Sequence, residues 1–469
     1  MFIRLSFISL AVIVTASCTL GPDYQRPVVE TPSAYRGAEP TPAAAGPSLA
    51  DREWFELFQD PTLTKLVSTA LDQNFDVRIA AERVLQARAL AGIVRADQFP
   101  TVDASAAGIT ARASRIGANR AIPQNADTDV SYAEAGFTVS WELDVWGRLR
   151  RLSESARAQY FATIEARRGI VTTLVGDVME TYLALRALDL ELEIARRTHE
   201  IASESLRLTQ ARLDRGVGTA LDVRQAEQLL YTASGQIASF EREIVQTENA
   251  LSLLLGEAPA DVPRGLPLEA FQSPPSIPAG LPSALLERRP DIRQAEQELI
   301  AANAQIGAAK AEYFPRISLT GFLGVQSRSL TDLISGPASV WTASAGAVAP
   351  IFNAGRTREN VRFVEAVQRE LVVNYQRTIY TALREVSDAL EGHRKTSAQR
   401  TEQERLVEAL RASTRLSTQR YEGGVDNYLQ VLDAQRNWFQ GELDLARLRQ
   451  QELAAIVQLY RALGGGWKR

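Results

Sequence analysis

The sequence predicts a mostly helical α+β membrane protein built from a duplicated helix–strand–strand–helix–helix repeat. Three observations lead to this fold class: an internal repeat, two long stretches without proline, and segments in which apolar and polar residues alternate. The expected division of the chain is a signal peptide over 1–17, an extended N-terminal segment over 18–60, repeat 1 over 61–256, an inter-repeat linker over 257–282 and repeat 2 over 283–466.

The internal repeat is visible as short motifs that recur at a nearly constant shift. Asp76-Val77-Arg78 recurs as Asp291-Ile292-Arg293, a shift of 215 (291 − 76). Further along the chain the shift is 208, since Gly216-Val217 recurs as Gly424-Val425 (424 − 216). Matches that keep one order over such a length indicate a duplication.

Proline placement marks where long helices can run. No proline occurs from Gln124 to Ala258 or from Ile351 to Arg469. A proline inside a helix costs about 3 kcal/mol or more, so these gaps favour uninterrupted helices. Seven prolines lie from Pro259 to Pro282, which predicts a linker and no helix between the repeats.

Each repeat is expected to contain one very long helix and two shorter ones. In repeat 1, a helix over about 62–98 precedes the strands, a helix from Gly147 to Arg215 follows them, and a third ends at Gly256. The long helix would extend about 100 Å at ~1.5 Å per residue. Its apolar positions form two seams, whereas a two-stranded coiled coil needs one, so we expect helical neighbours on both sides.

Alternating segments follow the first helix of each repeat, over about 101–113 and 130–144, and over about 316–328 and 340–352. Segments of about ten residues with one apolar and one polar face are typical of transmembrane barrel strands. Trp141 and Trp341 on the apolar faces fit the aromatic belt at a membrane interface. The alternation also fits half-buried strands of a soluble sandwich, in which both tryptophans would belong to the core.

The number of strands predicts the oligomer. Four strands are too few to close a barrel, and an open sheet edge is not tolerated in lipid. If these strands span a membrane, the remaining strands come from other copies of the chain, and three copies supply twelve. We therefore expect a homotrimer.

The N-terminus has the layout of a secretory signal. A basic residue precedes an apolar run over 5–14, which is too short to span a bilayer as a helix. Small residues then lead to Cys18, the only cysteine, although Thr15 replaces the aliphatic residue usual in a lipobox. A diacylglycerol and an N-acyl group on Cys18 would anchor the segment 18–60, and Thr19 fits export to the outer membrane. The alternative is ordinary signal cleavage beside an unmodified cysteine.

The composition does not predict an enzyme. The chain has 469 residues, a net charge of −4, one Cys and two His. His199 and His393 lie alone in charged helical stretches, where a solvated position is commoner than a catalytic or ligand role. Motifs of nucleotide-binding proteins, zinc proteases and serine hydrolases are absent, so we expect neither a catalytic nor a metal site. The charge balance provides no basic surface for nucleic acid.

Short motifs run in order along the mature chain, at Gly21–Pro27, Trp54-Phe55, Asp60-Pro61, Arg288–Ile292, Tyr313–Pro315, Gly424–Leu429 and Leu432–Arg436. Together they resemble the TolC family of outer-membrane factors, in particular its NodT- and OprM-like lipoproteins. Each motif is moderately specific, and the ordered set is much more so.

The resemblance implies a trimer in which a 12-stranded outer-membrane β-barrel continues into a 12-helix periplasmic α-barrel, with an equatorial layer of linker segments. It implies the function of an exit duct in a tripartite efflux system that carries small molecules such as drugs or toxic compounds. The partners would be a periplasmic adaptor (membrane fusion protein) and an inner-membrane pump, often of the resistance-nodulation-division type. The duct would do no chemistry and would control access at its periplasmic tip.

The resemblance also places a gate just after the hairpin turns, at Asp222, Leu429, Asp433 and Arg436. Three copies of Asp222 and Asp433 would put six carboxylates around a narrow pore, and a ring of Leu429 would resist wetting. The carboxylate ring would suit binding of a divalent ion, or an inter-chain pair with Arg436 that holds the tip closed. Where the family pattern has an arginine after the second turn, this chain has Asp426. The alternative for Asp433 and Arg436 is an exposed helical pair of little energetic weight.

The turns themselves are candidate adaptor contacts: Arg215, Gly216, Val217 and Gly218 in repeat 1, and Gly423, Gly424 and Val425 in repeat 2. Glycine also suits a plain reversing turn, since it tolerates positive φ, and the two roles are compatible.

Other function classes stay open at this point. A type I secretion duct for proteins would have the same architecture. A lipid-anchored periplasmic coiled-coil adaptor would explain the helices and Cys18, but it would explain neither the duplication nor the strands. An enzyme or sensor on a helical stalk lacks a catalytic constellation.

Overall fold

The computed structural model describes residues 19–36, 48–51, 53–114, 128–271, 280 and 282–466. The helices and strands are, in chain order, α2 (Pro61–Gln73), α3 (Phe75–Ala96), β1 (Thr101–Arg112), β2 (Asp129–Leu143), α4 (Arg148–Asp214), α5 (Ala220–Leu255), α6 (Leu285–Arg288), α7 (Pro290–Ala311), β3 (Arg316–Ser327), β4 (Ser339–Val348), α8 (Arg356–Glu422) and α9 (Tyr428–Ala462). Short 3-10 helices lie at Leu49–Asp51, Trp54–Glu56, Leu268–Ala270, Pro282–Ala284, Leu330–Asp332 and Gly336–Ala338.

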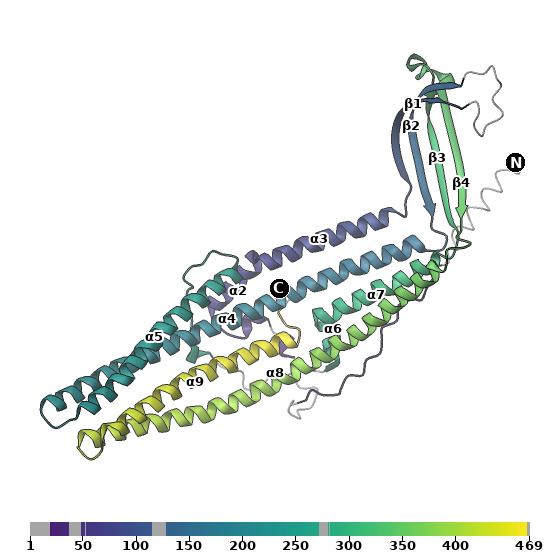
Figure 1. Ribbon diagram of the computed structural model, residues 1–469. Coiled ribbons are helices and arrows are strands. Elements are labelled where there is room, and N and C mark those ends of the chain that lie inside the picture. The colour runs from purple at the N-terminus through teal and green to yellow at the C-terminus, as the bar shows by residue number, and fades with distance from the viewer. Residues whose placement is uncertain are drawn as a thin grey trace. The chain divides into compact units, whose positions relative to one another are not determined.

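The chain forms two compact units, whose elements are labelled in Figure 1. Unit 1 combines the described parts of Met1–Pro27, Val84–Ala162 and Ala295–Asn374. Unit 2 combines those of Val28–Arg83, Thr163–Gln294 and Tyr375–Arg469. Each unit therefore takes segments from both sequence repeats.

Unit 1 contains one antiparallel sheet of four strands in the order β1-β2-β3-β4. The register runs from Thr101↔Ser140 between β1 and β2, through Leu143↔Ile317 between β2 and β3, to Arg316↔Val348 between β3 and β4. Within the described residues, the outer edges of β1 and β4 have no strand partner. Because β1 and β4 run in opposite directions, these edges can pair with one another between copies in an antiparallel ladder.

The register places most of the large apolar residues of the strands on one face of the sheet. Residues directly opposite share a face, and one such row is Phe137, Leu323 and Trp341. The other face is polar, and the hydroxyl oxygens of Thr320 and Ser344 lie 2.6 Å apart across it. The predicted alternation is therefore continuous across the sheet, as in a wall between lipid and water.

The extended segment that follows Cys18 is held against both repeats in unit 1. Arg26 donates two hydrogen bonds of 2.6 Å to the carboxylate of Glu296 in α7. Arg151 in α4 donates to the carbonyl oxygen of Leu20 at 3.1 Å. Since Glu296 and Arg151 are buried, this segment satisfies polar groups on helices of both repeats.

In unit 2, α4, α5, α8 and α9 contribute to two clusters of buried side chains. One cluster contains Ala202, Ala226, Leu229, Tyr421, Tyr428, Val431 and Leu432. The other contains Ile194, Ala195, Phe240, Phe439, Leu443 and Ala446. The helical hairpins of the two repeats are therefore joined by apolar seams of the kind expected from the sequence.

The prediction of a single helix over about 62–98 was wrong in one respect. The structure has two helices, α2 and α3, on either side of Asn74. Asn74 has φ −56° and ψ 135°, outside the helical region. Its Oδ1 accepts hydrogen bonds from the backbone N–H groups of Asp76 (2.8 Å) and Val77 (3.1 Å), as an N-cap does. Its Nδ2 donates to the carbonyl oxygen of Leu254 at 2.9 Å, which ties the break to the end of α5.

Repeat 2 makes the corresponding junction with a different residue. Arg289 matches Asn74 at the shift of 215 (289 − 74) and lies between α6 and α7. Its Nη1 donates to the carbonyl oxygen of Ala462 at 2.9 Å. Ala462 in turn matches Leu254 at the shift of 208 (462 − 254). An amide in one repeat and a guanidinium in the other therefore make the same helix-end contact.

The described part of the linker, up to residue 271, is fastened to α4. The Tyr182 hydroxyl donates to Asp60 Oδ2 at 3.0 Å and accepts from the backbone N–H of Gly265 at 2.8 Å. The backbone N–H of Leu266 donates to the same carboxylate at 3.1 Å. A Cβ on Gly265 would clash with the Asp60 carboxylate, so only glycine fits here.

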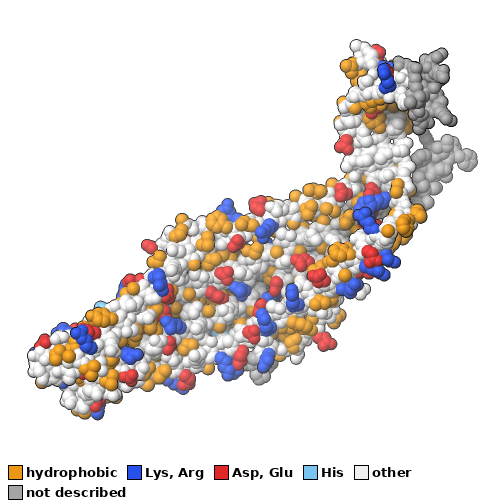
Figure 2. All heavy atoms as spheres, viewed as in Figure 1, with side chains coloured by type: hydrophobic (Ala, Val, Ile, Leu, Met, Phe, Trp, Pro, Cys, Tyr) orange, Lys and Arg blue, Asp and Glu red, His pale blue; other side chains and the backbone are white. Residues whose placement is uncertain are grey.

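Charged side chains are spread over the visible face of the helices and are fewer over the strands (Figure 2). Pairs three residues apart, such as Arg394–Glu391 and Arg405–Glu402, are typical of solvated helix faces. In the part of the chain that the structure describes, no helix is both long and apolar enough to cross a membrane.

Candidate functional site

The helical hairpins of unit 2 reverse direction through the same type of turn. Gly216 after α4 has φ 71° and Gly424 after α8 has φ 75°. In each turn, the backbone N–H of the following valine donates at 2.9 Å to the carbonyl group five residues earlier. This is the Schellman pattern, in which a left-handed glycine closes a helix. The candidate adaptor contacts, over 215–218 and 423–425, form these two turns.

Apolar side chains are exposed beside both turns. Val217 and Val425 are 66% and 65% exposed, and Leu221 and Leu429 are 64% and 48% exposed. These residues match pairwise at the shift of 208. Exposed apolar groups at equivalent positions of both hairpins are the property expected of a contact surface.

Asp222 takes part in a helix cap. The Thr219 hydroxyl accepts from the backbone N–H of Asp222 at 3.2 Å, and Asp222 Oδ2 accepts from the backbone N–H of Thr219 at 3.0 Å. Such a capping box stabilises a helix by about 1 kcal/mol. The spacing Thr-x-x-Asp in the sequence indicates this capping box. Sequence reasoning considered Asp222 only as a gate residue and did not predict the cap.

Leu429, Asp433 and Arg436 lie on one exposed face of α9, at spacings of four and three residues. The opposite face carries the buried residues Tyr428, Val431, Leu432 and Gln435. Asp433 accepts a hydrogen bond from Asn437 at 3.2 Å, and the described residues show no ion pair between Asp433 and Arg436. The structure thus brings the three repeat-2 gate candidates together on one surface.

Two tyrosines behind this face join the hairpins. The rings of Tyr421 and Tyr428 meet edge to face with centroids 5.3 Å apart. The guanidinium carbon of Arg212, from the other hairpin, lies 4.7 Å from the Tyr421 ring centroid. Burial raises the pKa of Tyr428 to about 12. Sequence reasoning missed this cluster, although an aromatic residue on each side of the turn was a usable signal.

Asp426, where the family pattern has an arginine, pairs within its own turn. Arg420 donates to Asp426 from Nε at 2.6 Å and from Nη2 at 3.1 Å. Hydrogen bonding from Arg420 lowers the pKa of the Asp426 carboxyl group. The pair connects the last turn of α8 to the loop before α9, so it braces the hairpin.

Trp141 and Trp341 lie on the apolar face of the sheet but in different rows. Trp141 is opposite Leu319 and Trp341 is opposite Leu323. These rows are four residues apart along β3, or about 13 Å, roughly half of the ~25 Å apolar band of an outer-membrane barrel. Trp141 also donates from its indole nitrogen to the carbonyl oxygen of Gln98 at 3.0 Å, at the helix end of the sheet.

Further aromatic residues gather where the helices meet the strands in unit 1. Phe99, Tyr313 and Phe352 are exposed there, and Phe314 packs on Trp146 with ring centroids 4.8 Å apart. The indole nitrogen of Trp146 donates to the Pro315 carbonyl oxygen at 2.9 Å. Sequence reasoning did not include these residues in an aromatic belt, although Phe99 and Phe314 directly precede prolines that end the helices.

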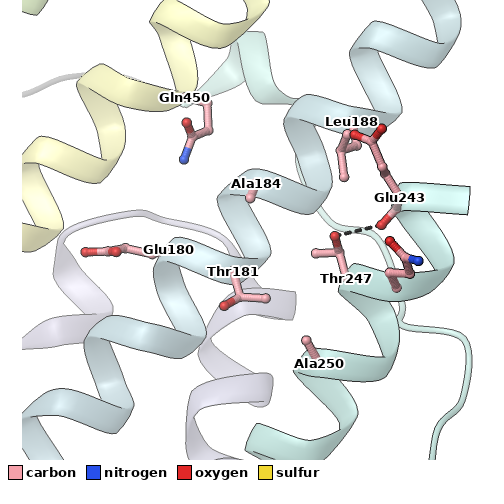
Figure 3. A pocket seen from close by; sticks show the side chains of 9 residues that line it. Glu180, Thr181, Ala184, Leu188, Glu243, Thr247, Ala250 and Gln450 are labelled. Carbon is pink, nitrogen blue, oxygen red and sulfur yellow. Dashed lines mark hydrogen bonds between the residues drawn. The ribbon is translucent and has the colours of Figure 1, made fainter. Parts of the chain in front are cut away.

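A cavity of about 520 Å³ lies between α4, α5 and α9 in unit 2 (Figure 3). Its lining mixes polar and apolar side chains and consists of Glu180, Thr181, Ala184, Leu188, Glu243, Gln246, Thr247, Ala250 and Gln450. The Thr247 hydroxyl donates to the backbone carbonyl of Glu243 at 2.8 Å, the dashed line in Figure 3, as threonines within helices commonly do. The lining therefore presents no hydroxyl paired with a base.

A second cavity, of about 480 Å³, lies at the equivalent place in repeat 2. Its residues Asp388 and Gly392 match Glu180 and Ala184 at the shift of 208. The two cavities are thus one feature of the duplicated helix pair. Within the described residues, no group of three or more His, Cys, Asp and Glu side chains could hold a metal ion. Cys18, the predicted lipidation site, lies outside the described residues.

The duplicated helical hairpins and the amphipathic sheet lie within the residues that a known family matches. The family model described as "Outer membrane efflux protein" matches residues 66–257 and 281–465. The chain belongs to this family.

Relatives are similar along nearly their whole length. The toluene efflux pump outer membrane protein TtgI of Pseudomonas putida is 40% identical over 466 residues, with 97% of each chain covered. The probable outer membrane lipoprotein SilC of Salmonella typhimurium is 34% identical over 466 residues, with 99% of each covered.

Solved structures of channels agree with the fold. CusC has a TM-score of 0.85 at 33% identity, covering 96% of this chain and 100% of that one. The open state of the Neisseria gonorrhoeae MtrE outer membrane channel has a TM-score of 0.86 at 31% identity, covering 96% and 99%.

Family membership confirms the predicted fold class and function. The protein is an outer-membrane channel of a tripartite efflux system, and its structural neighbours are trimeric channels. Three chains with four strands each supply the twelve strands of the barrel, as predicted. The family consists of channel components of transport systems.

Proposed function

We propose that this channel is the exit duct for small, toxic organic molecules. The observation that carries the proposal is the 40% identity to the toluene efflux pump outer membrane protein of Pseudomonas putida over 97% of both chains. Solvent and antibiotic efflux pump outer membrane proteins of the same organism are similar as well, at 40% and 37% identity. A polar inner wall of strands suits diffusion of such solutes, because it holds water and offers few strong contacts.

The channel works with a periplasmic adaptor and an inner-membrane pump of the resistance-nodulation-division type. The adaptor would contact the turns over 215–218 and 423–425. In support, Val217 and Val425 are exposed at equivalent places and their backbones are fixed by left-handed glycines. An apolar side chain on a rigid turn loses little conformational entropy when a partner binds over it.

The periplasmic gate consists of Leu429, Asp433 and Arg436, with Asp222 beside them. Three copies of the exposed α9 face would line a narrow pore. A leucine ring resists wetting there, and a ring of Asp433 carboxylates attracts cations or pairs with Arg436 of a neighbouring chain. Asp222 contributes mainly charge, because its carboxylate is engaged in the cap of α5.

Single-channel conductance of the purified trimer in planar bilayers tests both the channel and its gate. The double variant Leu429→Ala with Asp433→Ala should conduct more than the wild type, because it removes the apolar constriction and the carboxylate ring. Asp444→Ala, an exposed carboxylate further along α9, is the matched control and should leave the conductance unchanged. Equal conductance in the double variant and the wild type would remove the gate assignment, and absence of conductance in all variants would contradict the channel.

The lipid anchor is a diacylglycerol and N-acyl modification of Cys18, which follows a signal peptide over 1–17. In support, SilC is named an outer membrane lipoprotein. The position of the residues after Cys18 also supports the anchor. The backbone N–H of Leu20 donates a hydrogen bond to the carbonyl oxygen of Trp146, which follows β2. A Cβ on Gly307 would clash with the Leu20 carbonyl oxygen, so the segment is tightly seated. The residues directly after Cys18 are thus held beside the helix end of the strands.

The membrane interface on the helix side would be marked by Trp141 together with Phe99, Tyr313 and Phe314. All of these lie near the junction of helices and strands in unit 1. Trp341, about 13 Å further along the strands, would lie within the apolar band. Its 74% exposure in the single chain fits contact with lipid.

A further inference from the structure

Phe322 is an aromatic residue on the polar face of the sheet. On β3 it is opposite Thr138 of β2 and Thr342 of β4, two hydroxyl residues of that face. Alternation along β3 places the neighbouring apolar residues, such as Leu323, on the lipid-facing side. In the trimeric barrel, Phe322 therefore faces the water-filled lumen.

The Phe322 ring lies along the sheet and does not project from it. A Cβ on Gly136 or on Gly324 would each be 2.7 Å from its Cζ atom, so the ring tip occupies the space above both glycines. These glycines face one another across β2 and β3, and a Cβ on either would also clash with backbone atoms of the neighbouring strand. Only glycine leaves room for the ring, and Phe322 itself is partly exposed.

Hydroxyl residues flank this ring on both neighbouring strands, and two acidic residues lie further out on the same face. Glu134 is the next residue beyond Gly136 on the same face, and its carboxylate accepts from Gln326 at 3.2 Å. Asp103 of β1 is opposite Thr138, in the row of Phe322. From the row of Thr101 to the row of Glu134, this face of the described strands carries no Lys or Arg. Arg316 lies on this face at the start of β3, six residues before Phe322, and Arg328 follows the end of β3.

We propose that Phe322, with Glu134 and Asp103, forms a contact site for organic ammonium ions in the barrel lumen. The proposal rests on the export function above and adds a solute class to it. An aromatic face attracts quaternary and alkylated ammonium groups through its quadrupole, and the carboxylates add charge complementarity. A cation with an apolar group can place both parts on this surface. Three chains supply three such sites around one lumen.

Fluorine NMR of 4-(trifluoromethyl)phenyltrimethylammonium with the purified trimer tests the site, since line broadening reports binding whatever the state of the gate. Phe322→Leu, which still covers the glycines, should weaken binding about three- to fivefold. Glu134→Gln should weaken it as well, and Phe322→Tyr should retain it. Phe137→Leu, on the lipid-facing side of the neighbouring strand, is the matched control and should bind like the wild type.

The anion 4-(trifluoromethyl)benzenesulfonate separates charge recognition from general adsorption and should show no dependence on Phe322. Equal cation binding by Phe322→Leu and Phe137→Leu would overturn the site. If Phe322→Leu does not fold, unchanged binding by Glu134→Gln overturns it instead. Conductance of the wild type is a separate readout, so a conducting channel without Phe322-dependent binding rejects this inference alone and leaves the export function intact.

Discussion

At the scale of single residues, Glu180 is a partly buried carboxylate of unit 2 that forms no ion pair with the described residues. Its Oε1 is buried and accepts no hydrogen bond from the described residues. Burial raises the pKa of the Glu180 carboxyl group, Arg461 opposes this shift and Asp177 adds to it. Burial also raises the pKa of Glu191, but Arg447 pairs with that carboxylate at 2.7 Å and opposes the shift. We therefore expect the ionised Glu180 carboxylate to lower the free energy of unfolding, compared with the protonated form.

We predict that Glu180→Gln raises the thermal stability of the trimer at about pH 8 and that this gain disappears towards about pH 4. The pKa of Glu180 is higher in the folded than in the unfolded chain, so ionisation costs folding free energy above the folded pKa. As the pH falls through that raised pKa, the wild-type carboxyl group gains its proton and the cost vanishes. Thermal denaturation at both pH values measures the difference.

Glu241→Gln is the control for this prediction, because Glu241 is exposed and pairs with Arg196 on the surface at 2.8 Å. Surface pairs contribute little, so this variant should change stability only slightly at either pH. A loss of stability in Glu180→Gln at about pH 8 would mean that a partner stabilises the ionised carboxylate.

Some site residues could be predicted from the sequence because their chemistry is local. A helix that ends in a left-handed residue favours glycine at that position. Both repeats have this glycine, at Gly216 and at Gly424. The cap formed by Thr219 and Asp222 is equally local and could have been predicted. The contact of Arg212 with Tyr421 could not, because it joins two hairpins whose packing the periodicity does not specify.

At the scale of elements, strands were more predictable than helix ends. Alternation located the four strands, although on β4 it continues past Val348, where the ladder stops two residues before Pro350. Proline cannot donate a ladder hydrogen bond, which explains the earlier end. The break at Asn74 escaped notice because neither proline nor glycine marks it. Its cause is a side chain that caps one helix and binds the end of another.

We predict that Asn74→Ala lowers the free energy of unfolding by about 1–3 kcal/mol, because it removes an N-cap and leaves the Leu254 carbonyl group without its donor. Asn74→Asp keeps the cap but loses the donor, so its effect should be intermediate. Chemical denaturation of the purified protein measures both. Asn437→Ala, an exposed helical asparagine, should be close to the wild type. If Asn74→Ala matches that control, the break does not depend on the cap.

At the scale of the whole molecule, the duplication and the strand count were enough to predict the assembly. Each repeat supplies two strands, and the sheet leaves the edges of β1 and β4 without partners within the described residues. The position of the N-terminal segment could not be predicted, because the segment has no periodicity. Its position depends on contacts with Glu296 and Arg151, which come from different repeats. The central claim is that three chains close one barrel through these two edges.

Disulfide cross-linking between β1 and β4 tests this claim most directly. Ser105→Cys is combined in turn with Val340→Cys, Thr342→Cys and Ser344→Cys, which all lie on the polar face of the sheet. A disulfide forms only where Cα atoms are about 4.4–6.8 Å apart, so at least one combination should yield covalent dimers and trimers on non-reducing gels. Each single variant should remain uncross-linked. Correctly inserted protein that stays monomeric in every combination would contradict a barrel closed by β1 and β4.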